Sequence, residues 1–92
     1  MQAQNIYYSV SQTDPHLTAS WNDARDGTGG APADFASGDI FIVQGTGGDS
    51  GAPHNMNMTG DWTVSGANSK IIVETGASLT ISGGNLVTQQ MQ

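Results

Sequence analysis

Short runs of apolar residues, each followed by glycine or small polar residues, recur along most of this chain. Four of them lie in the segment 61–87, DWTVSGANSKIIVETGASLTISGGNLV. Apolar and polar residues alternate within the runs, as they do along a β-strand whose successive side chains point to opposite faces. One face would carry Met56, Met58, Trp62, Val64, Ile71, Val73, Leu79 and Ile81, and the other Asn57, Thr63, Ile72 and Thr80. The pattern therefore predicts strands with one buried face.

Seven segments are predicted to be strands, because they group β-branched and aromatic residues between turn-forming residues. They span residues 5–11, 39–45, 55–60, 61–66, 70–76, 78–84 and 85–89. Between the first two, Leu17, Trp21 and Ala24 would share one face of a short helical turn over 17–24. The segment 26–32, DGTGGAP, then ends any helix.

The spacing of the strands indicates how they pack. The interval from Met56 to Ile71 is nearly the same as the interval from Trp62 to Leu79 and from Ile71 to Leu86, so alternate strands recur regularly. Recurrence at a fixed short period is typical of β-solenoids, in which equivalent residues of successive coils stack. An antiparallel sandwich or meander would give similar spacing, but the Asn-Gly pairs typical of tight hairpins are absent. We therefore predict an all-β fold and a short β-solenoid, with the antiparallel β-sandwich or meander as the alternative.

The 92 residues are enough for a single small domain over 1–92. We expect an N-terminal strand and an irregular entry segment rich in Trp, Pro and Gly over 1–38, followed by solenoid coils over 39–92. The predicted core consists of Trp21, Phe35, Phe41, Val43, Met56, Met58, Trp62, Val64, Ile71, Val73, Leu79 and Ile81.

Charge limits the partners that the chain can bind. Eight acidic residues stand against two basic ones, giving a net charge of −6. A nucleic-acid site must neutralise several phosphates, and an anionic membrane surface also attracts basic residues, so we expect neither partner. No run of residues is long and apolar enough to cross a membrane. Residues 1–4, MQAQ, are similar to the remnant that follows a signal-peptide cleavage site, which predicts secretion. An added initiator methionine would explain Met1 equally well.

A family resemblance supports an extracellular location. It rests on the order Trp21, Pro32, Phe35, Gly38, Asp39, Phe41, Val43, His54, Met56, Trp62, Val64 and Gly66, which continues into 70–82. This order resembles secreted β-solenoid cell-surface proteins, the large adhesin-like proteins of gliding, polysaccharide-associated bacteria. The resemblance covers residues 21–84. It implies a structural or adhesive role at the cell surface, and it implies no reaction.

Few residues are candidates for chemistry. Asp23 and Asp26, within NDARDG, could offer oxygen ligands to calcium. The spacing lacks the alternating acids and closing glutamate of an EF-hand loop, so we favour an acidic turn whose carboxylates accept bonds from backbone amides. The chain has no cysteine. We predict no metal and no cofactor.

An enzymatic role is not expected from the remaining polar residues. Ser50 lies in GGDSGAP, which is similar to the nucleophile segment of trypsin-like proteases, but the chain is too short for two barrels. His16 and His54 have no acid at a triad-like spacing. Glu74 is the one carboxylate inside a strong predicted strand, whereas glycoside hydrolysis needs a pair.

The two ends of the chain carry the predicted function. The N-terminal strand has no evident partner nearby, and the C-terminal segment GGNLVTQQMQ contains no charged residue and no proline that would protect a strand edge. We predict subunit-interface residues at both ends: Asn5, Ile6, Tyr7, Tyr8, Val10, Asn85, Leu86, Val87, Gln89 and Gln90. The predicted function is a structural subunit of an extracellular filament, which stacks head to tail with copies of itself by strand addition. The alternative is an adhesin module that binds a glycan, such as a cell-surface or extracellular polysaccharide, or another surface.

Overall fold

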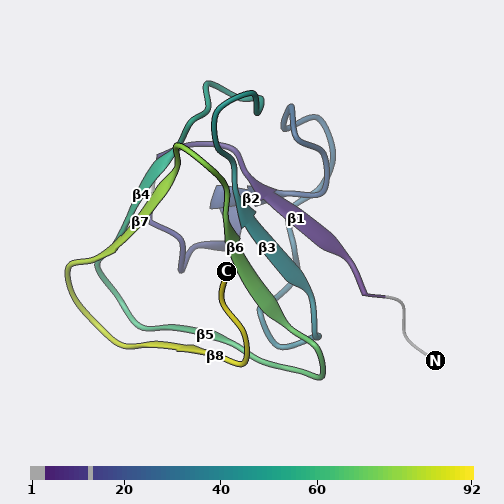
Figure 1. Ribbon diagram of the computed structural model, residues 1–92. Coiled ribbons are helices and arrows are strands. Elements are labelled where there is room, and N and C mark those ends of the chain that lie inside the picture. Colours follow the sequence, from purple (N-terminus) through teal and green to yellow (C-terminus); the bar gives the residue numbers. More distant parts are fainter. Residues whose placement is uncertain (1–3, 13) are drawn as a thin grey trace.

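The computed structural model describes residues 4–12 and 14–92 (Figure 1). Residues 1–3, on which the predicted signal-peptide remnant largely falls, lie outside this range. The strands are β1 (Ile6–Ser9), β2 (Trp21–Asn22), β3 (Ile40–Val43), β4 (Asn55–Met58), β5 (Trp62–Val64), β6 (Lys70–Val73), β7 (Ser78–Ile81) and β8 (Leu86–Thr88). A 3-10 turn, η1 (Thr18–Ser20), is the one helical element of the described residues. The prediction of an all-β chain is confirmed.

All seven predicted strands are present, with shorter bounds, and one further strand was not predicted. β2 occupies Trp21 and Asn22, where a helical turn over 17–24 was expected. That prediction is wrong: the chain makes a single 3-10 turn and then becomes extended, with Leu17 48% exposed and Trp21 1% exposed. The indole Nε1 of Trp21 donates to the backbone oxygen of Pro15, which holds the short turn against the core.

The strands form three small sheets that are almost entirely parallel. One sheet has the order β2–β1–β3–β6, and the other two pair β4 with β7 and β5 with β8. Figure 1 shows the two strands of each small pair running side by side. The exception is β2, which pairs with β1 in the antiparallel sense. From β3 to β5, each strand therefore pairs in parallel with the third strand after it.

The predicted repeat interval is wrong. The apolar spacing matched each strand with the second strand after it, whereas Met56 lies opposite Leu79 instead of Ile71, and Trp62 lies opposite Leu86 instead of Leu79. The true interval is also less regular than expected. Phe41 lies opposite Ile71, and this interval is longer than those from β4 to β7 and from β5 to β8, because the loop between β3 and β4 is longer than the loop between β6 and β7.

Glycine is required at two corners where successive turns of the chain touch. Gly66 has φ +98°, and a Cβ built there would lie 2.2 Å from the backbone nitrogen of Gly38. Gly84 has φ +75°, and its Cβ would lie 2.5 Å from the carbonyl carbon of Gly60. Any larger residue would combine an unfavourable backbone conformation with a backbone clash.

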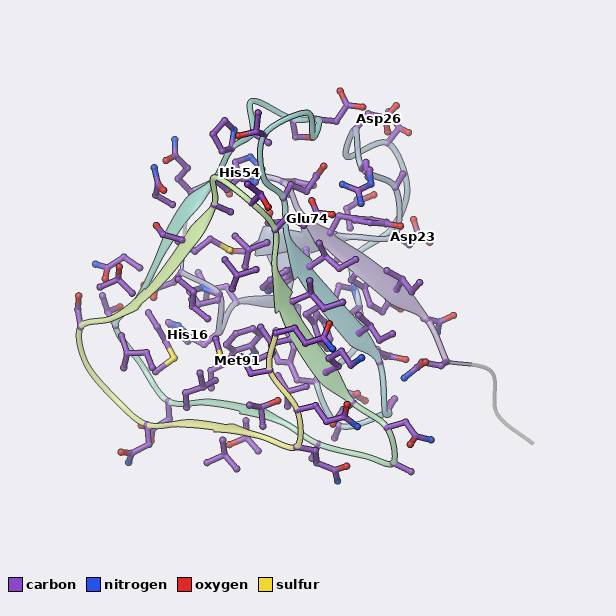
Figure 2. The ribbon with its side chains drawn as sticks, viewed as in Figure 1. His16, Asp23, Asp26, His54, Glu74 and Met91 are labelled. Atoms are coloured by element: carbon purple, nitrogen blue, oxygen red, sulfur yellow. The ribbon has the colours of Figure 1, made fainter. Side chains whose placement is uncertain are left out.

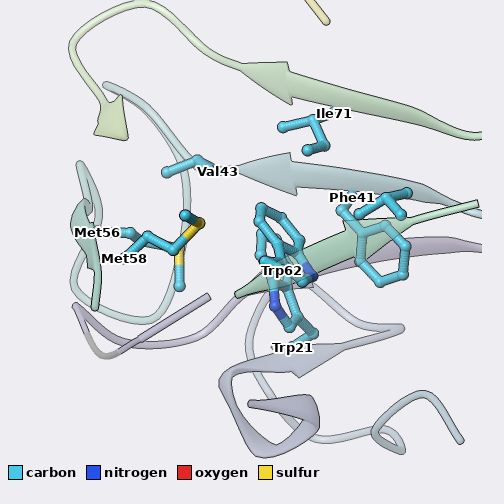
Figure 3. Packing of buried hydrophobic residues seen from close by; sticks show 8 residues of the cluster. Trp21, Phe41, Val43, Met56, Met58, Trp62 and Ile71 are labelled. Atoms are coloured by element: carbon cyan, nitrogen blue, oxygen red, sulfur yellow. The ribbon is translucent and has the colours of Figure 1, made fainter. Parts of the chain in front are cut away.

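The core lies between the three sheets (Figure 3). Its buried members are Trp21, Phe41, Val43, Met56, Met58, Trp62, Val64 and Ile71. The two indole rings stack with centroids 5.5 Å apart, and the ring of Phe41 meets that of Trp21 edge to face at 5.3 Å. Such aromatic contacts add to the large apolar area that these rings bury.

The predicted core differs from the observed one at its C-terminal end. Phe35, Val73 and Leu79 are only partly buried, although they pack against the core cluster. Ile81 is 51% exposed and does not belong to the core. The alternation placed Ile81 on the inner face, but no strand of the described residues lies beyond β7 to cover it. The core is thus closed near β1 to β3 and open near β7 and β8.

Candidate functional site at the strand edges

The outer edges of β4 and β5 that face away from β7 and β8, here called the head edge, are covered by the entry segment. The side-chain oxygen of Gln12 accepts a hydrogen bond from the backbone N–H of Asn55 at 3.3 Å. Asp14 Oδ1 accepts one from the N–H of Thr59 at 2.7 Å. Just after β5, the backbone oxygen of Phe35 accepts one from the N–H of Ser65 at 2.8 Å. These three donors are satisfied within the molecule and are not free to recruit another chain.

Asp14 is the charged member of this cover. Its carboxylate accepts bonds from both the hydroxyl and the backbone N–H of Thr59, and these two bonds lower the pKa of Asp14 below its ordinary value. His16 Nδ1 lies 3.3 Å from the same carboxylate, and its positive charge when protonated acts in the same direction. The ionised form of Asp14 is therefore the one that the head edge stabilises.

The opposite end of the molecule, here called the tail edge, consists of the outer edges of β7 and β8. The N–H of Ser78 donates to the backbone oxygen of His54, just before β4, and the N–H of Ser82 donates to that of Met58 in β4. Because backbone groups alternate in direction along a strand, those of Leu79 and Ile81 point away from β4. Within the described part of the chain, no strand pairs with this edge of β7 or with the corresponding edge of β8.

Apolar side chains accompany these open backbone groups. Val87 is 55% exposed and Met91 is 48% exposed, alongside the exposed Ile81. Leu79 and Leu86 are half-buried at the edge of the core cluster, whereas their partners in the preceding strands, Met56 and Trp62, are fully buried. The tail edge thus combines unpaired strand backbone with an incompletely covered core.

The third side of the tail end is partly covered by the last residues of the chain. Ile71 N–H donates to the oxygen of Gln90 at 3.0 Å, and Gln92 N–H donates to the oxygen of Ile71 at 2.8 Å. Met91 lies opposite Ile71 in a parallel bridge. Residues 90–92 therefore extend the β2–β1–β3–β6 sheet by one further partial strand, and Figure 2 shows Met91 beside this sheet.

The predicted interface residues fall into two groups with different surroundings. β1 is an internal strand, paired with β3 through Ile6, Tyr7 and Tyr8 and with β2 through Tyr8 and Ser9. The N-terminal strand was expected to be a loose end free to add to a neighbouring subunit. That expectation is wrong, because β1 pairs on both sides with strands of the same chain. At the C-terminal end, residues 85–87 lie at or in β8, whose outer edge is open within the described chain. The interface itself remains a prediction.

A buried polar cluster that the sequence did not reveal connects β1 to the loop after β3. Ser9 Oγ lies 2.6 Å from His54 Nδ1 and accepts the backbone N–H of Gln44 at 2.9 Å. His54 Nε2 lies 2.9 Å from the backbone oxygen of Ser50, an acceptor only. Because a carbonyl oxygen can only accept, His54 donates to Ser50 from Nε2.

This cluster has a structural role in holding the long loop. Ser9, Gln44 and His54 are each at most 1% exposed, so no substrate reaches them. The hydroxyl of Ser50 donates to the backbone oxygen of Arg25, and His54 contacts Ser50 through its carbonyl. The likeness of GGDSGAP to a protease segment therefore has no counterpart in the geometry.

An exposed ion pair joins the entry segment to the end of β6. Arg25 donates to both carboxylate oxygens of Glu74, at 3.1 and 2.9 Å, and its guanidinium lies 4.5 Å from the ring centre of Tyr8. The bond from Arg25 lowers the pKa of Glu74. The side chains are 40% and 30% exposed, so solvent screening limits the pair to at most about 1 kcal/mol. Figure 2 shows Glu74 at the end of β6.

The carboxylates of the acidic turn accept hydrogen bonds from backbone N–H groups of nearby residues. Asp23 Oδ1 accepts the N–H of Gly30 at 3.0 Å, and Asp26 Oδ1 accepts the N–H and hydroxyl of Thr28. The bonds from Thr28 lower the pKa of Asp26. In the described residues, no group of three or more His, Cys, Asp or Glu side chains is placed to hold a metal ion. Calcium binding at Asp23 and Asp26 remains untested.

Comparison with family models, with curated proteins and with solved structures finds no match to this chain. A search of the described residues for helices that could cross a membrane finds none of sufficient length and apolarity.

Proposed function

We propose that this protein is a structural subunit, a short parallel β-solenoid that associates with copies of itself by strand addition as part of an extracellular filament. The observation that carries the proposal is the tail edge, where β7 and β8 present unpaired backbone beside half-buried core residues. Strand edges of this kind bind other strands through main-chain hydrogen bonds.

The parallel register supports the solenoid assignment. β3, β4 and β5 pair in the same order with β6, β7 and β8, so the chain follows the same three-sided path twice. Inward residues of equal register stack, as Met56 does on Leu79 and Trp62 on Leu86. Each added coil of such a fold buries the coil beneath it, and the last coil needs either a polar cap or a partner.

The side chains around the tail edge lack the features that usually prevent association. Residues 75–92 contain no charged side chain and no proline. Natural edge strands are commonly protected by lysine, proline or a bulge. The glycan-binding alternative has less support, because Trp21 and Trp62 are each 1% exposed and offer no aromatic platform for a sugar ring.

Sedimentation velocity over a wide concentration range tests the proposal directly. We expect the protein to associate as its concentration rises, and Ile81→Lys to weaken association by placing a charge on the tail edge. Ala31→Lys is the matched control, since Ala31 is exposed in the loop between β2 and β3 and the substitution changes the net charge equally. A wild-type protein that stays monomeric at millimolar concentration would contradict the proposal.

A further inference from the structure

The two ends of the molecule are not complementary, and this determines how copies can meet. We propose that two copies bind tail to tail, with the β7 and β8 edges of one pairing in the antiparallel sense with those of the other about a twofold axis. The inference rests on the proposed function and specifies its partner and orientation. It differs from head-to-tail stacking, which needs an open edge at both ends.

Three backbone donors along the head edge are already bonded within the molecule. Gln12 and Asp14 accept from the N–H groups of Asn55 and Thr59 at the two ends of β4, and residue 35 accepts from residue 65 just after β5. A tail strand placed there would have to displace these contacts, including two bonds to an ionised carboxylate. Bonds to a charged group are stronger than ordinary backbone bonds. Pairing at the tail edge displaces no strand of the described chain.

The distribution of charge also favours contact between tails. Seven of the eight acidic residues lie within residues 1–61, and Glu74, the eighth, is bonded to Arg25. β7, β8 and residues 90–92 contain no charged side chain. Two copies that meet through these strands keep most of their acidic side chains outside the contact, where water and salt screen the repulsion.

Strand direction fits a twofold arrangement. β6, β7 and β8 follow one another around the end of the molecule in one sense. A twofold axis that lies in the plane of the tail end turns the second copy over. The strands of that copy then circulate in the opposite direction, so each would run antiparallel to the strand that it meets. Antiparallel pairs are slightly more stable per residue than parallel ones. Exposed Ile81 and Val87 would then be covered by the tail edge of the other copy, as in an isologous interface.

Distance measurements between spin labels distinguish the orientations. The chain has no cysteine, so Val87→Cys places a single label at the tail and Leu17→Cys places one in the entry segment next to Asp14. Both positions are exposed, at 55% and 48%. Electron paramagnetic resonance on each labelled protein gives the distance between equivalent labels, and sedimentation of the same samples gives the size of the assembly.

Tail-to-tail binding predicts that the dimer is the first assembly to form as the concentration rises, and that a filament grows only through a further contact between dimers. We expect a short distance between labels at Val87 and a much longer one between labels at Leu17. Ile81→Lys should weaken the dimer about tenfold or more, because the twofold brings two new charges together. Val87→Lys gives the same test should the first variant fold poorly.

The remaining outcomes separate this inference from the function on which it rests. Assemblies larger than dimers, with comparable label distances at both positions, would overturn the tail-to-tail inference and leave the proposed function intact. A short distance at Leu17 alone would overturn the orientation in the same way. Monomers at all concentrations would overturn both proposals.

Discussion

Asp14 links the entry segment to the end of β4 through its side chain. Its carboxylate bonds both the backbone N–H and the hydroxyl of Thr59, which is distant in sequence. No hydrophobic pattern could predict this contact, because an aspartate before proline is an ordinary turn residue. The sequence therefore gives no indication that Thr59 is the partner of Asp14.

The contacts of Asp14 predict a pH-dependent contribution to stability. Folding lowers the pKa of Asp14 below its ordinary value of 3.8. The folded state therefore gains from the ionised carboxylate above pH 3.8, and loses that gain as the pH falls through the lower, folded-state pKa. We expect Asp14→Ala to lower the melting temperature at neutral pH and to have a smaller effect in strong acid, measured by circular dichroism. Equal effects at both pH values would contradict this assignment, and Thr59→Val should reduce the effect of Asp14→Ala.

The buried cluster of Ser9, Gln44 and His54 shows a further limit of residue-level prediction. Each residue was visible in the sequence, but Ser9 is far from the other two along the chain. Only the parallel pairing of β1 with β3 brings Ser9 to Gln44, and that pairing depends on the path of the intervening entry segment. Non-local pairing of this kind leaves no local signal in composition or periodicity.

The strands themselves were largely predictable as elements. The segments of β4, β5 and β7 alternate apolar and polar residues, those of β6 and β8 group apolar residues, and each forms a strand between glycine-containing turns. Their pairing was less predictable, because the sequence does not indicate how many strands make up one complete turn of the chain. The spacing of apolar residues is compatible with pairing each strand to the second strand after it, whereas the structure pairs each with the third strand after it. β2 was missed because two residues are too few to show a period.

The corners between strands predict which glycines tolerate substitution. Gly84 and Gly51 both have positive φ, +75° and +80°, so alanine at either should cost about 1 kcal/mol from the backbone alone. A Cβ at Gly84 would also lie 2.5 Å from the carbonyl carbon of Gly60, whereas a Cβ at Gly51 would meet nothing within 4 Å. We expect Gly84→Ala to lower the free energy of unfolding in urea clearly more than Gly51→Ala does. Equal losses would show that the corners are not tightly stacked.

The contrast between the two ends gives a prediction for the whole molecule. If the entry segment prevents binding at the head edge, then removing its side-chain contacts should let assembly continue beyond the dimer. We expect the double variant Gln12→Ala with Asp14→Ala to form longer species in sedimentation and in negative-stain images, because the N–H groups of Asn55 and Thr59 become free.

A charge-matched control separates edge exposure from reduced repulsion. The carboxylate of Asp26 accepts bonds within its own turn, from the N–H and hydroxyl of Thr28, so Asp26→Ala removes one acidic group without touching β4 or β5. This variant should behave as the wild type does. Dimers of unchanged size in the double variant would show that the entry segment is not what limits assembly.

The parallel pairing has a consequence for how fast the chain reaches its native state. Apart from the short β1–β2 contact, the paired strands are distant in sequence, and the structure of the described residues contains no tight hairpin that could form first. Closing such long loops costs entropy before any pair is stabilised, which places chains of this topology among the slow folders, in roughly milliseconds to seconds rather than microseconds. Until the pairs form, every strand has unpaired edges like those of β7 and β8 in the folded protein. Folding at low protein concentration should therefore favour the native state over aggregation.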